Sequence, residues 1–490
     1  MKLQAVRGLV LVAALVGCSG TPAVMNRGDS RGAGGAGVGN AGSGGANGGG
    51  GPVIVLPTAD GGGPAPSNSA PCEKLSCQQT NCQVGACQQK ACASGGKTTL
   101  KGKVFDPAGK VPLYNVLVYV PNAPLDPIET GPSCDRCDKP VSGKPVAWAL
   151  TDTKGGFVMD NVPVGTDIPL VIQVGKWRRE VTVPKTEACA ETVFEDPQVM
   201  RLPRKQSEGN IPKIALATGM ADRLECLLRK MGIDDSEFTT ETGNGRINFF
   251  AGRGGSPSFA PTHNGGATFT PATMFWNDPA AYDRYDLVIL SCEGNQYIQD
   301  KPLTAREALV AYANKGGRVF ASHWHNVWLE DGPAPWSEVA TFSGRNVSLP
   351  DPYATNVDTS FPKGAALAEW LVNVGASMTS GQLELREAKR TVEAINPMYT
   401  RRWIYNASMM PSPVQYFTFN TPAGAEMGKE CGRTVFTDIH VSAGDQGGAP
   451  FPTGCVTTDL SPQEKALEFM LFDLSSCLQP DDKPQPPVIP

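Results

Sequence analysis

The sequence predicts a multidomain chain in which an all-β sandwich is followed by an α/β doubly wound domain. The length of 490 residues exceeds what a single hydrophobic core usually supports. Residues 98–186 alternate apolar and polar side chains in short runs broken by turns, a pattern typical of an all-β sandwich. In residues 211–478 buried strands alternate with helices, which indicates a mostly parallel sheet covered by helices on both faces.

The chain opens with an export leader, residues 1–17. Its apolar run of about ten residues is too short to cross a bilayer of roughly 30 Å. The box Leu15-Val16-Gly17-Cys18 resembles the signal at which bacterial lipoproteins are cleaved and acylated. This resemblance implies lipidation of Cys18 and an extracytoplasmic, lipid-anchored protein. Ser19 is not the acidic residue that retains lipoproteins at the inner membrane, so we expect the outer membrane, on either of its faces.

A tether and a cysteine-rich segment follow. Residues 18–71 are rich in Gly, Ala, Asn, Ser and Pro and bury too little apolar surface to fold, so we expect a disordered linker. Residues 72–97 carry cysteines at a constant spacing of five. With this spacing, neither a helix nor a strand would place all the sulfurs on one side. In an exported chain this pattern predicts disulfides rather than a metal site, with one cysteine paired outside the segment or unpaired. The cysteines are Cys72, Cys77, Cys82, Cys87 and Cys92.

The β region, residues 98–186, is predicted from short apolar runs at 100–105, 116–120, 157–159 and 170–174. The turn motifs at 102–109, 151–157 and 162–165 resemble the carboxypeptidase regulatory-like, transthyretin-like sandwich family. That resemblance implies a seven-stranded module that usually has no activity of its own. An insertion at 122–146 carries Cys134 and Cys137 in a Pro-rich loop, for which we expect a local disulfide rather than redox or metal chemistry.

The α/β region is predicted element by element. Helix start signals occur at Thr304–Glu307 and Ser461–Glu464, each a capping box, and Pro462 stands at the first helical position of the second. We treat residues 324–413 as an insertion of uncertain structure and 479–490 as a disordered tail. Expected strands are 213–218, 286–291, 318–322, 415–419 and 433–438, and expected helices are 221–231, 304–314 and 461–474.

Residues 285–292, residues 308–317 and the strand that ends before His323 resemble the class I glutamine amidotransferase-like superfamily, especially its trehalose-utilisation-like branch. The resemblance implies a flavodoxin-like, doubly wound fold. The amidotransferase nucleophile lies in a G-x-C-x-G turn, whereas this chain has Leu290-Ser291-Cys292-Glu293-Gly294. The family's catalytic role is therefore not carried over directly to Cys292.

The chain as a whole, through residues 114–127, 175–179 and 472–477, resembles a family of uncharacterised myxobacterial surface lipoproteins. Relatives sometimes carry the label tryptophan synthase alpha chain. We discount that label because the enzyme is a cytosolic (β/α) barrel, which an exported, cysteine-rich, two-domain chain does not fit.

Reactive residues follow three of the expected parallel strands, where ligands usually collect. One interpretation makes Cys292 a nucleophile with His323 or His325 as its base. The interpretation we favour is a disulfide of Cys292, with Cys226 as the candidate partner.

Two further interpretations use the same region. His323, His325, Asp438 and His440 offer ligands for a divalent metal, since alternation along a strand keeps both histidines of His-x-His on one face. Flat aromatic rings nearby would suit a sugar, and these are Trp324, Trp328 and Trp336.

We therefore expect a binding or structural module rather than an enzyme, attached to the membrane through Cys18 and acting without a cofactor. Carbohydrate or another surface protein is the expected partner. The alternatives are a Cys–His or metal-dependent hydrolase and a carbohydrate-binding protein. A formal net charge of -5, from 43 basic and 48 acidic residues, gives no basic field for nucleic acid.

Overall fold

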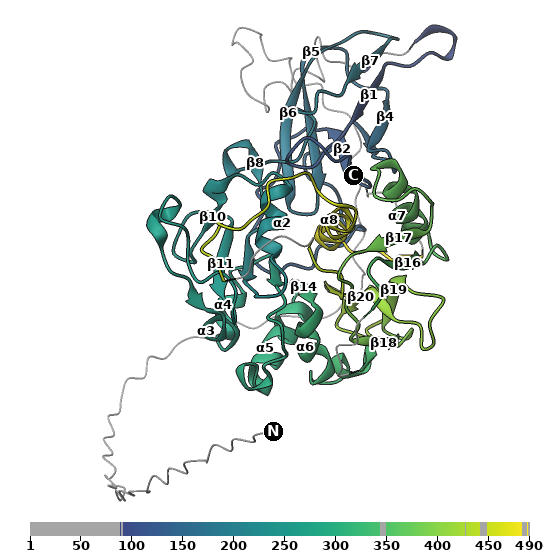
Figure 1. Cartoon of the computed structure of the whole chain (residues 1–490). Helices are drawn as coiled ribbons and strands as arrows, with labels where there is room; N and C mark the ends of the chain where they lie inside the picture. Colours follow the sequence, from purple (N-terminus) through teal and green to yellow (C-terminus); the bar gives the residue numbers. More distant parts are fainter. Residues whose placement is uncertain are drawn as a thin grey trace, which may run out of the picture. The chain divides into compact units, whose positions relative to one another are not determined.

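The computed structural model describes residues 89, 92–343, 349–426, 428–441, 448–482 and 488 (Figure 1). The predictions for the leader, for Cys18, for the linker and for Cys72 to Cys87 lie outside these residues. Within the described part of the chain, none of the helices is long and apolar enough to cross a membrane.

The described residues form mainly β-strands, in several sheets, with few helices. The strands are β1 (Thr99–Lys103), β2 (Leu117–Val120), β3 (Ala147–Leu150), β4 (Gly156–Asp160), β5 (Gly165–Val174), β6 (Trp177–Thr186), β7 (Glu191–Phe194), β8 (Gly209–Asn210), β9 (Ile214–Ala217), β10 (Phe238–Thr239), β11 (Ile247–Ala251), β12 (Thr270–Pro271), β13 (Leu287–Leu290), β14 (Arg318–Ser322), β15 (Ala340–Phe342), β16 (Tyr353–Val357), β17 (Gln382–Leu385), β18 (Val392–Ile395), β19 (Thr400–Tyr405), β20 (Val414–Thr421) and β21 (Gly432–Thr437). The α-helices are α2 (Leu224–Lys230), α3 (Ala272–Trp276), α4 (Pro279–Tyr282), α5 (Leu303–Asn314), α6 (Val327–Glu330), α7 (Pro362–Asn373) and α8 (Pro462–Ser475).

The first strands form two small sheets, ordered β4-β1-β7 and β3-β2-β5-β6-β8. Four of these strands, β1, β2, β4 and β5, lie where the apolar runs predict them. Leu100 and Met159 from one sheet and Val118 and Ile172 from the other are fully buried in the same hydrophobic cluster. The two sheets therefore share a core, as their alternating sequence pattern requires.

The largest sheet is parallel from β10 through β11, β9, β13 and β14 to β21, and continues with antiparallel β20, β19, β16 and β17. The sheet is therefore mixed. Residues 324–413, the expected insertion, supply three of the antiparallel strands that extend it, β16, β17 and β19. Helix α8 begins with the predicted capping box at Ser461, with Pro462 in its first turn. The capping box predicted at Thr304 is wrong, because α5 begins one residue earlier and Pro302 is its N-cap.

Side chains of the parallel strands alternate between two hydrophobic clusters. Ile214 and Leu216 of β9 belong to one cluster, and Ala215 and Ala217 belong to the other. The first cluster also contains side chains of α2, α7, α8 and both small sheets, whereas the second contains those of α3 to α6. Helices therefore cover both faces of the parallel strands, and the small sheets share a core with one of these faces.

Disulfides connect distant parts of the chain. The local Cys134–Cys137 bond that we expected is wrong, because the insertion runs beside the end of α8, where Cys137 N donates to Leu478 O at 3.0 Å. This contact places Cys137 beside Cys477, and Arg136, whose Nη1 donates to Glu430 O at 3.3 Å, helps to place Cys134 beside Cys431. Disulfides are typical of an oxidising compartment. The bonds are Cys92–Cys189, Cys134–Cys431, Cys137–Cys477 and Cys226–Cys455.

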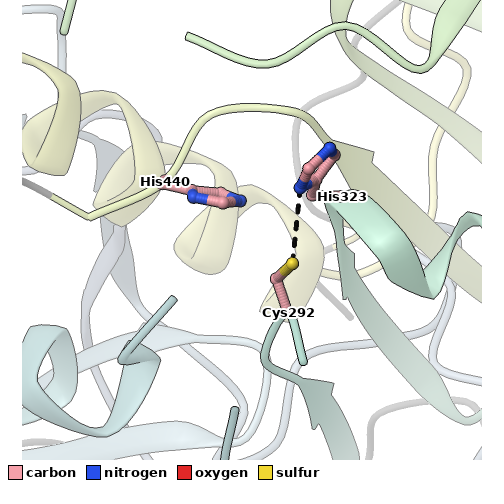
Figure 2. A group of neighbouring side chains, drawn as sticks. All are labelled: Cys292, His323 and His440. Carbon is pink, nitrogen blue, oxygen red and sulfur yellow. Dashed lines mark hydrogen bonds between the residues drawn. The ribbon is translucent and has the colours of Figure 1, made fainter. Parts of the chain in front are cut away.

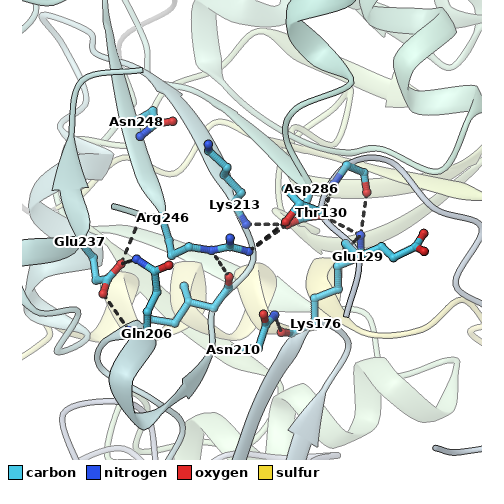
Figure 3. Close-up of polar contacts among 12 residues, drawn as sticks. Glu129, Thr130, Lys176, Gln206, Asn210, Lys213, Glu237, Arg246, Asn248 and Asp286 are labelled. Carbon is cyan, nitrogen blue, oxygen red and sulfur yellow. Dashed lines mark hydrogen bonds and ion pairs between the residues drawn. The ribbon is translucent and has the colours of Figure 1, made fainter. Parts of the chain in front are cut away.

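Asp286, just before β13, joins the insertion to the large sheet (Figure 3). Its Oδ1 accepts hydrogen bonds from Gly131 N at 2.8 Å and from Lys176 Nζ at 2.6 Å. Its Oδ2 accepts a bond from Lys213 N at 2.5 Å. The carboxylate is buried, so little water is available to replace it as the hydrogen-bond acceptor of these donors.

We expect Asp286→Ala to lower the free energy of unfolding by about 3 kcal/mol, because the substitution leaves the backbone N–H groups of Gly131 and Lys213 without an acceptor. It also removes the carboxylate that pairs with the half-buried Lys176 ammonium, which then keeps only carbonyl acceptors. Urea denaturation measures this change. Asp283→Ala is the matched control, since Asp283 pairs with the exposed Lys315 and its loss is expected to cost less than about 1 kcal/mol. Equal losses in the two variants would contradict a role for Asp286 as a buried hub.

Candidate functional site

The candidate site lies at the carboxyl ends of three neighbouring parallel strands. β14 pairs with β13 on one side and with β21 on the other. Cys292 follows β13, His323 follows β14 directly, and His440 follows β21. Because the strands run in the same direction, these three side chains reach the same edge of the sheet.

The structure brings Cys292, His323 and His440 together (Figure 2). The Sγ of Cys292 lies 3.3 Å from Nδ1 of His323, and the ring centres of His323 and His440 are 5.0 Å apart. One donor atom from each residue lies within 4.8 Å of the other two. The exposed fractions of the side chains are 0%, 1% and 5%, so the cluster is enclosed by protein.

The electrostatics of the cluster favour neutral side chains. Burial raises the pKa of the Cys292 thiol to about 12, although backbone N–H groups of Trp324 and Gly294 donate to the sulfur and oppose this shift. Burial, followed by the charge of His440 and of Lys389, lowers the pKa of His323 to about 2. Burial lowers the pKa of His440 to about 3. At neutral pH the cluster therefore holds a protonated thiol and two neutral imidazoles.

Cys292 is a free thiol, so the expected disulfide with Cys226 is wrong. Cys226 lies in α2 and is bonded to Cys455 instead. The edge of the sheet that carries Cys292 is occupied by histidines rather than by another cysteine. The sulfur is therefore available as a donor atom.

His325 does not join the cluster, because the chain turns immediately after β14. His323 has a left-handed backbone with φ of 44° and begins a short 3-10 helix, η6 (His323–Asn326). The strand alternation expected for His-x-His is lost there. Trp328 Nε1 donates to His325 Nδ1 at 2.8 Å, and the other ring nitrogen of His325 lies 2.9 Å from Ser291 O. Both nitrogens are thus used within the core.

Asp438 also lies apart from the expected metal ligands. Its carboxylate accepts hydrogen bonds from the backbone N–H and the hydroxyl of Thr391, at 2.7 and 2.8 Å. Burial raises its pKa to about 7, against these hydrogen bonds. Asp438 therefore connects β21 to the segment before β18 and does not face His323 or His440.

The aromatic residues proposed for sugar binding are mostly core residues. Trp328 and Trp336 are each 1% exposed and belong to the cluster around α3 to α6. Trp324 is half-buried and its ring centre lies 4.9 Å from that of His323. Of the three rings, only that of Trp324 lies beside the candidate site and reaches solvent.

A loop between β9 and α2, residues 218–223, positions all three strand ends. Ala221 N donates to Cys292 O at 2.9 Å. Asp222 Oδ2 accepts from the hydroxyl of Ser322, which precedes His323, and its Oδ1 accepts from the backbone N–H of Val441, which follows His440, at 2.9 Å. Sequence reasoning missed this loop, because its residues show no ligand-like spacing.

Gly219 of this loop explains how closely it approaches the site. A Cβ atom at this position would lie 2.3 Å from Cys292 O and 2.4 Å from Ser291 O. Any larger residue would push the loop away from the strand that carries the thiol. The site is thus assembled by backbone contacts as well as by side chains.

The donor set fits a late first-row transition metal. Zinc is usually bound by thiolate and imidazole at about 2.3 and 2.1 Å, which places donors roughly 3.5 Å apart in a tetrahedral site. The 3.3 Å contact between Cys292 and His323 already has this spacing, and the 4.8 Å limit requires a closure of about 1 Å. Nε2 of His323 and of His440 is buried without a hydrogen-bond partner among the described residues.

Comparisons with known proteins give little guidance to this site. No family model matches the chain, and the search of curated proteins gave no match. A ThuA-like protein from Bacteroides uniformis aligns with 53% of this chain and 89% of its own, at 9% identity and a TM-score of 0.28. A chain of a type II cohesin–X-dockerin complex from Acetivibrio cellulolyticus aligns with 29% of this chain and 75% of its own, at 14% identity and a TM-score of 0.14.

Proposed function

We propose that the protein is an exported binding module whose working site is a transition-metal centre formed by Cys292, His323 and His440. One observation carries the proposal. A free thiol and two imidazoles from three different strand ends place donor atoms within 4.8 Å of one another in the protein interior. Thiolate and imidazole favour zinc and its late first-row neighbours over calcium or magnesium. This proposal replaces the expectation of a protein without a cofactor.

The same geometry argues against a nucleophilic cysteine. A nucleophile needs a thiolate and access to substrate. The thiol of Cys292 is fully buried and its pKa is raised to about 12, while the neighbouring His323 has a pKa lowered to about 2 and is a weak base. A bound divalent ion would instead displace the thiol proton and hold the sulfur as thiolate.

Metal analysis tests the proposal. Purified, folded protein that has been stripped with a chelator and reloaded with zinc is expected to retain about one ion per chain after gel filtration. Cys292→Ser and His440→Gln are expected to retain almost none, because each removes one of three donors. His263→Gln is the matched control, since His263 is a half-buried histidine that pairs with Asp235 outside the site. Wild-type protein that retains no zinc while folded would overturn the proposal.

The setting of this module remains as the sequence predicts it. We propose that Cys18 carries the lipid anchor and that the metal site is presented outside the cytoplasm, at the outer membrane. The disulfides support an oxidising environment. Membership of the myxobacterial surface lipoprotein family is part of this proposal.

The fold assignment is proposed on the strand order. The parallel strands β11-β9-β13-β14-β21 follow the order 2-1-3-4-5, which is that of flavodoxin-like, doubly wound sheets. This order supports the amidotransferase-like assignment of residues 211–478, and the two small sheets support the transthyretin-like assignment of residues 98–186.

A second candidate function is metal-dependent hydrolysis, which the number of ligands favours and the burial of all three side chains opposes. Three protein ligands leave one position of a tetrahedral site open, as in catalytic rather than structural zinc sites. Carbohydrate remains a candidate partner only through Trp324, which lies beside His323.

A further inference from the structure

The candidate metal centre combines one thiol with two imidazoles and encloses all three. Cys292, His323 and His440 are buried, and their donor atoms lie within 4.8 Å of one another. Figure 2 shows the sulfur and both rings directed toward one common space. Among the described residues, this group of cysteine, histidine and carboxylate donors has these three members. The centre therefore offers an ion one sulfur and two nitrogens, shut off from solvent.

This combination of donors distinguishes copper from zinc. Zinc completes a tetrahedron, either with a fourth protein ligand or with a water molecule. Copper is also stable with three close ligands, and one cysteine with two histidines is the trigonal ligand set of copper sites that transfer electrons. Copper also stands above zinc in the order of affinity for a given site. A buried centre with three donors therefore suits copper better than zinc.

The backbone beside the sulfur supports the same ion. Gly294 N donates a hydrogen bond to Cys292 Sγ at 3.4 Å. Gly294 has a φ of 84°, a left-handed conformation that favours glycine, so the turn after Cys292 is built for this contact. Hydrogen bonds to the cysteine sulfur are one of the means by which proteins set the reduction potential of a copper centre.

Two buried carboxylates supply negative charge around the ligands. Asp222 accepts hydrogen bonds from the residue before His323 and from the residue after His440, and Asp438 lies two residues before His440. A thiolate with Cu²⁺ leaves one positive charge, which these carboxylates compensate, whereas a thiolate with Cu⁺ is already neutral. The acidic surroundings therefore stabilise Cu²⁺ in a buried site.

A tryptophan connects the buried centre to the surface. The ring centre of Trp324 lies 4.9 Å from that of His323, and the two ring planes are tilted by 35°. Trp324 is half-buried, so its ring joins a ligand of the centre to solvent. Electrons cross short gaps between rings without the entry of a substrate. Burial, which opposes hydrolysis at this centre, is thus compatible with electron transfer.

We infer that the Cys292–His323–His440 centre holds copper in trigonal coordination and transfers single electrons. This inference rests on the proposed metal site and names its ion and its reaction. Cu²⁺ accepts one electron from a reductant of the enediol class and becomes Cu⁺, and a ferric complex removes that electron again. The thiolate and both imidazoles stay bound in both states, so no bond forms or breaks and no proton moves.

Copper-loaded protein provides the first test. Folded protein loaded with stoichiometric Cu²⁺ is expected to show an intense visible absorption from sulfur-to-copper charge transfer. Ascorbate, an enediol, should abolish this absorption, and ferricyanide should restore it. Cys292→Ser is expected to lose the absorption entirely, because the sulfur is the source of the transition. His263→Gln is the matched control and should keep it, since His263 pairs with Asp235 outside the site.

The reduction potential provides a second test. Asp222→Asn keeps an oxygen that accepts from Val441 N but removes a negative charge beside the ligands. We expect the equilibrium between Cu²⁺ and Cu⁺ to shift toward Cu⁺ at least tenfold, a rise of roughly 59 mV in the potential. Asp283→Asn is the matched control, because Asp283 is exposed and pairs with Lys315, and its potential should equal that of wild type.

The outcomes separate the inference from the proposed function. An absorption that depends on Cys292 and cycles with the two reagents supports the inference. Protein that retains zinc, but whose copper form lacks this absorption or does not cycle, overturns the inference and leaves the metal site standing. If Cys292→Ser does not fold, equal potentials in Asp222→Asn and Asp283→Asn overturn the inference. Folded wild-type protein that retains neither ion overturns both.

Discussion

The affinity of the folded protein for zinc is expected to rise about tenfold for each pH unit between about pH 6 and pH 9, roughly a thousandfold in all. Only deprotonated ligands bind the ion, so each ligand that is protonated in the free protein must release one proton. Burial raises the pKa of the Cys292 thiol to about 12, so the thiol is protonated throughout this range. The pKa values of His323 and His440 are lowered to about 2 and 3, so both rings are already neutral.

The expected result is therefore the release of one proton per zinc ion. The slope of zinc affinity against pH should not become steeper near the ordinary histidine pKa. Competition with a chromophoric chelator measures the affinity at each pH, and calorimetry in buffers of different ionisation enthalpy counts the protons. His263→Gln should follow the wild-type line. Release of two or three protons at about pH 6 would mean that the imidazoles are charged in the free protein, against the burial seen here.

The elements that carry the site could be predicted from local sequence. The strand before Cys292 is a continuous apolar run, and the strands before His323 and His440 each have an apolar centre between polar ends, which favours buried parallel strands. Parallel strand ends share one edge, so the meeting of these three residues follows from fold class alone. This is why the sequence could pair Cys292 with His323 as nucleophile and base, and His323 with His440 as metal ligands, although neither interpretation joined all three residues.

The finer selection of ligands could not be predicted, because it depends on tertiary contacts. His323 leaves the strand with a positive φ, and this single turn directs His325 to Ser291 and Trp328 instead of to the site. Asp438 is withdrawn by Thr391, which comes from a region with no clear sequence pattern. The disulfide partners are separated by 97 to 340 residues, and no local spacing encodes such pairs.

The free energy of unfolding of Asp106→Asn is expected to exceed that of wild type by an amount that grows as pH rises. Asp106 is buried, and its Oδ1 accepts hydrogen bonds from the backbone N–H groups of Lys110 and Val111. Among the described residues, no donor group reaches its Oδ2 or either carboxylate oxygen of Glu468. Burial raises the pKa of Asp106 to about 6, and burial together with the neighbouring Asp106 carboxyl raises the pKa of Glu468 well above its ordinary value. An asparagine would keep the turn and offer an N–H to Glu468.

The sign of this effect follows from proton linkage. Below about pH 3, under its ordinary pKa of 3.8, Asp106 is protonated in both folded and unfolded chains and adds no pH dependence. Between that pH and its folded pKa of about 6, the unfolded chain releases a proton that the folded chain keeps, so wild-type stability falls as pH rises. Asparagine has no proton to release. Relative to wild type, the variant should therefore gain roughly 2 kcal/mol between about pH 4.5 and pH 8.

The comparison must be a difference between variant and wild type. His323 and His440 have lowered pKa values, so they destabilise the fold as pH falls below their ordinary value of 6.5, and this opposes the effect of the buried acids in the total curve. Urea unfolding at both pH values isolates Asp106. Asp152→Asn is the control, because Asp152 accepts the same kind of turn hydrogen bonds from Lys154 and Gly156 but is exposed. A gain in Asp106→Asn that is constant with pH, or equal to that of the control, would show that the folded protein does not raise the pKa of Asp106.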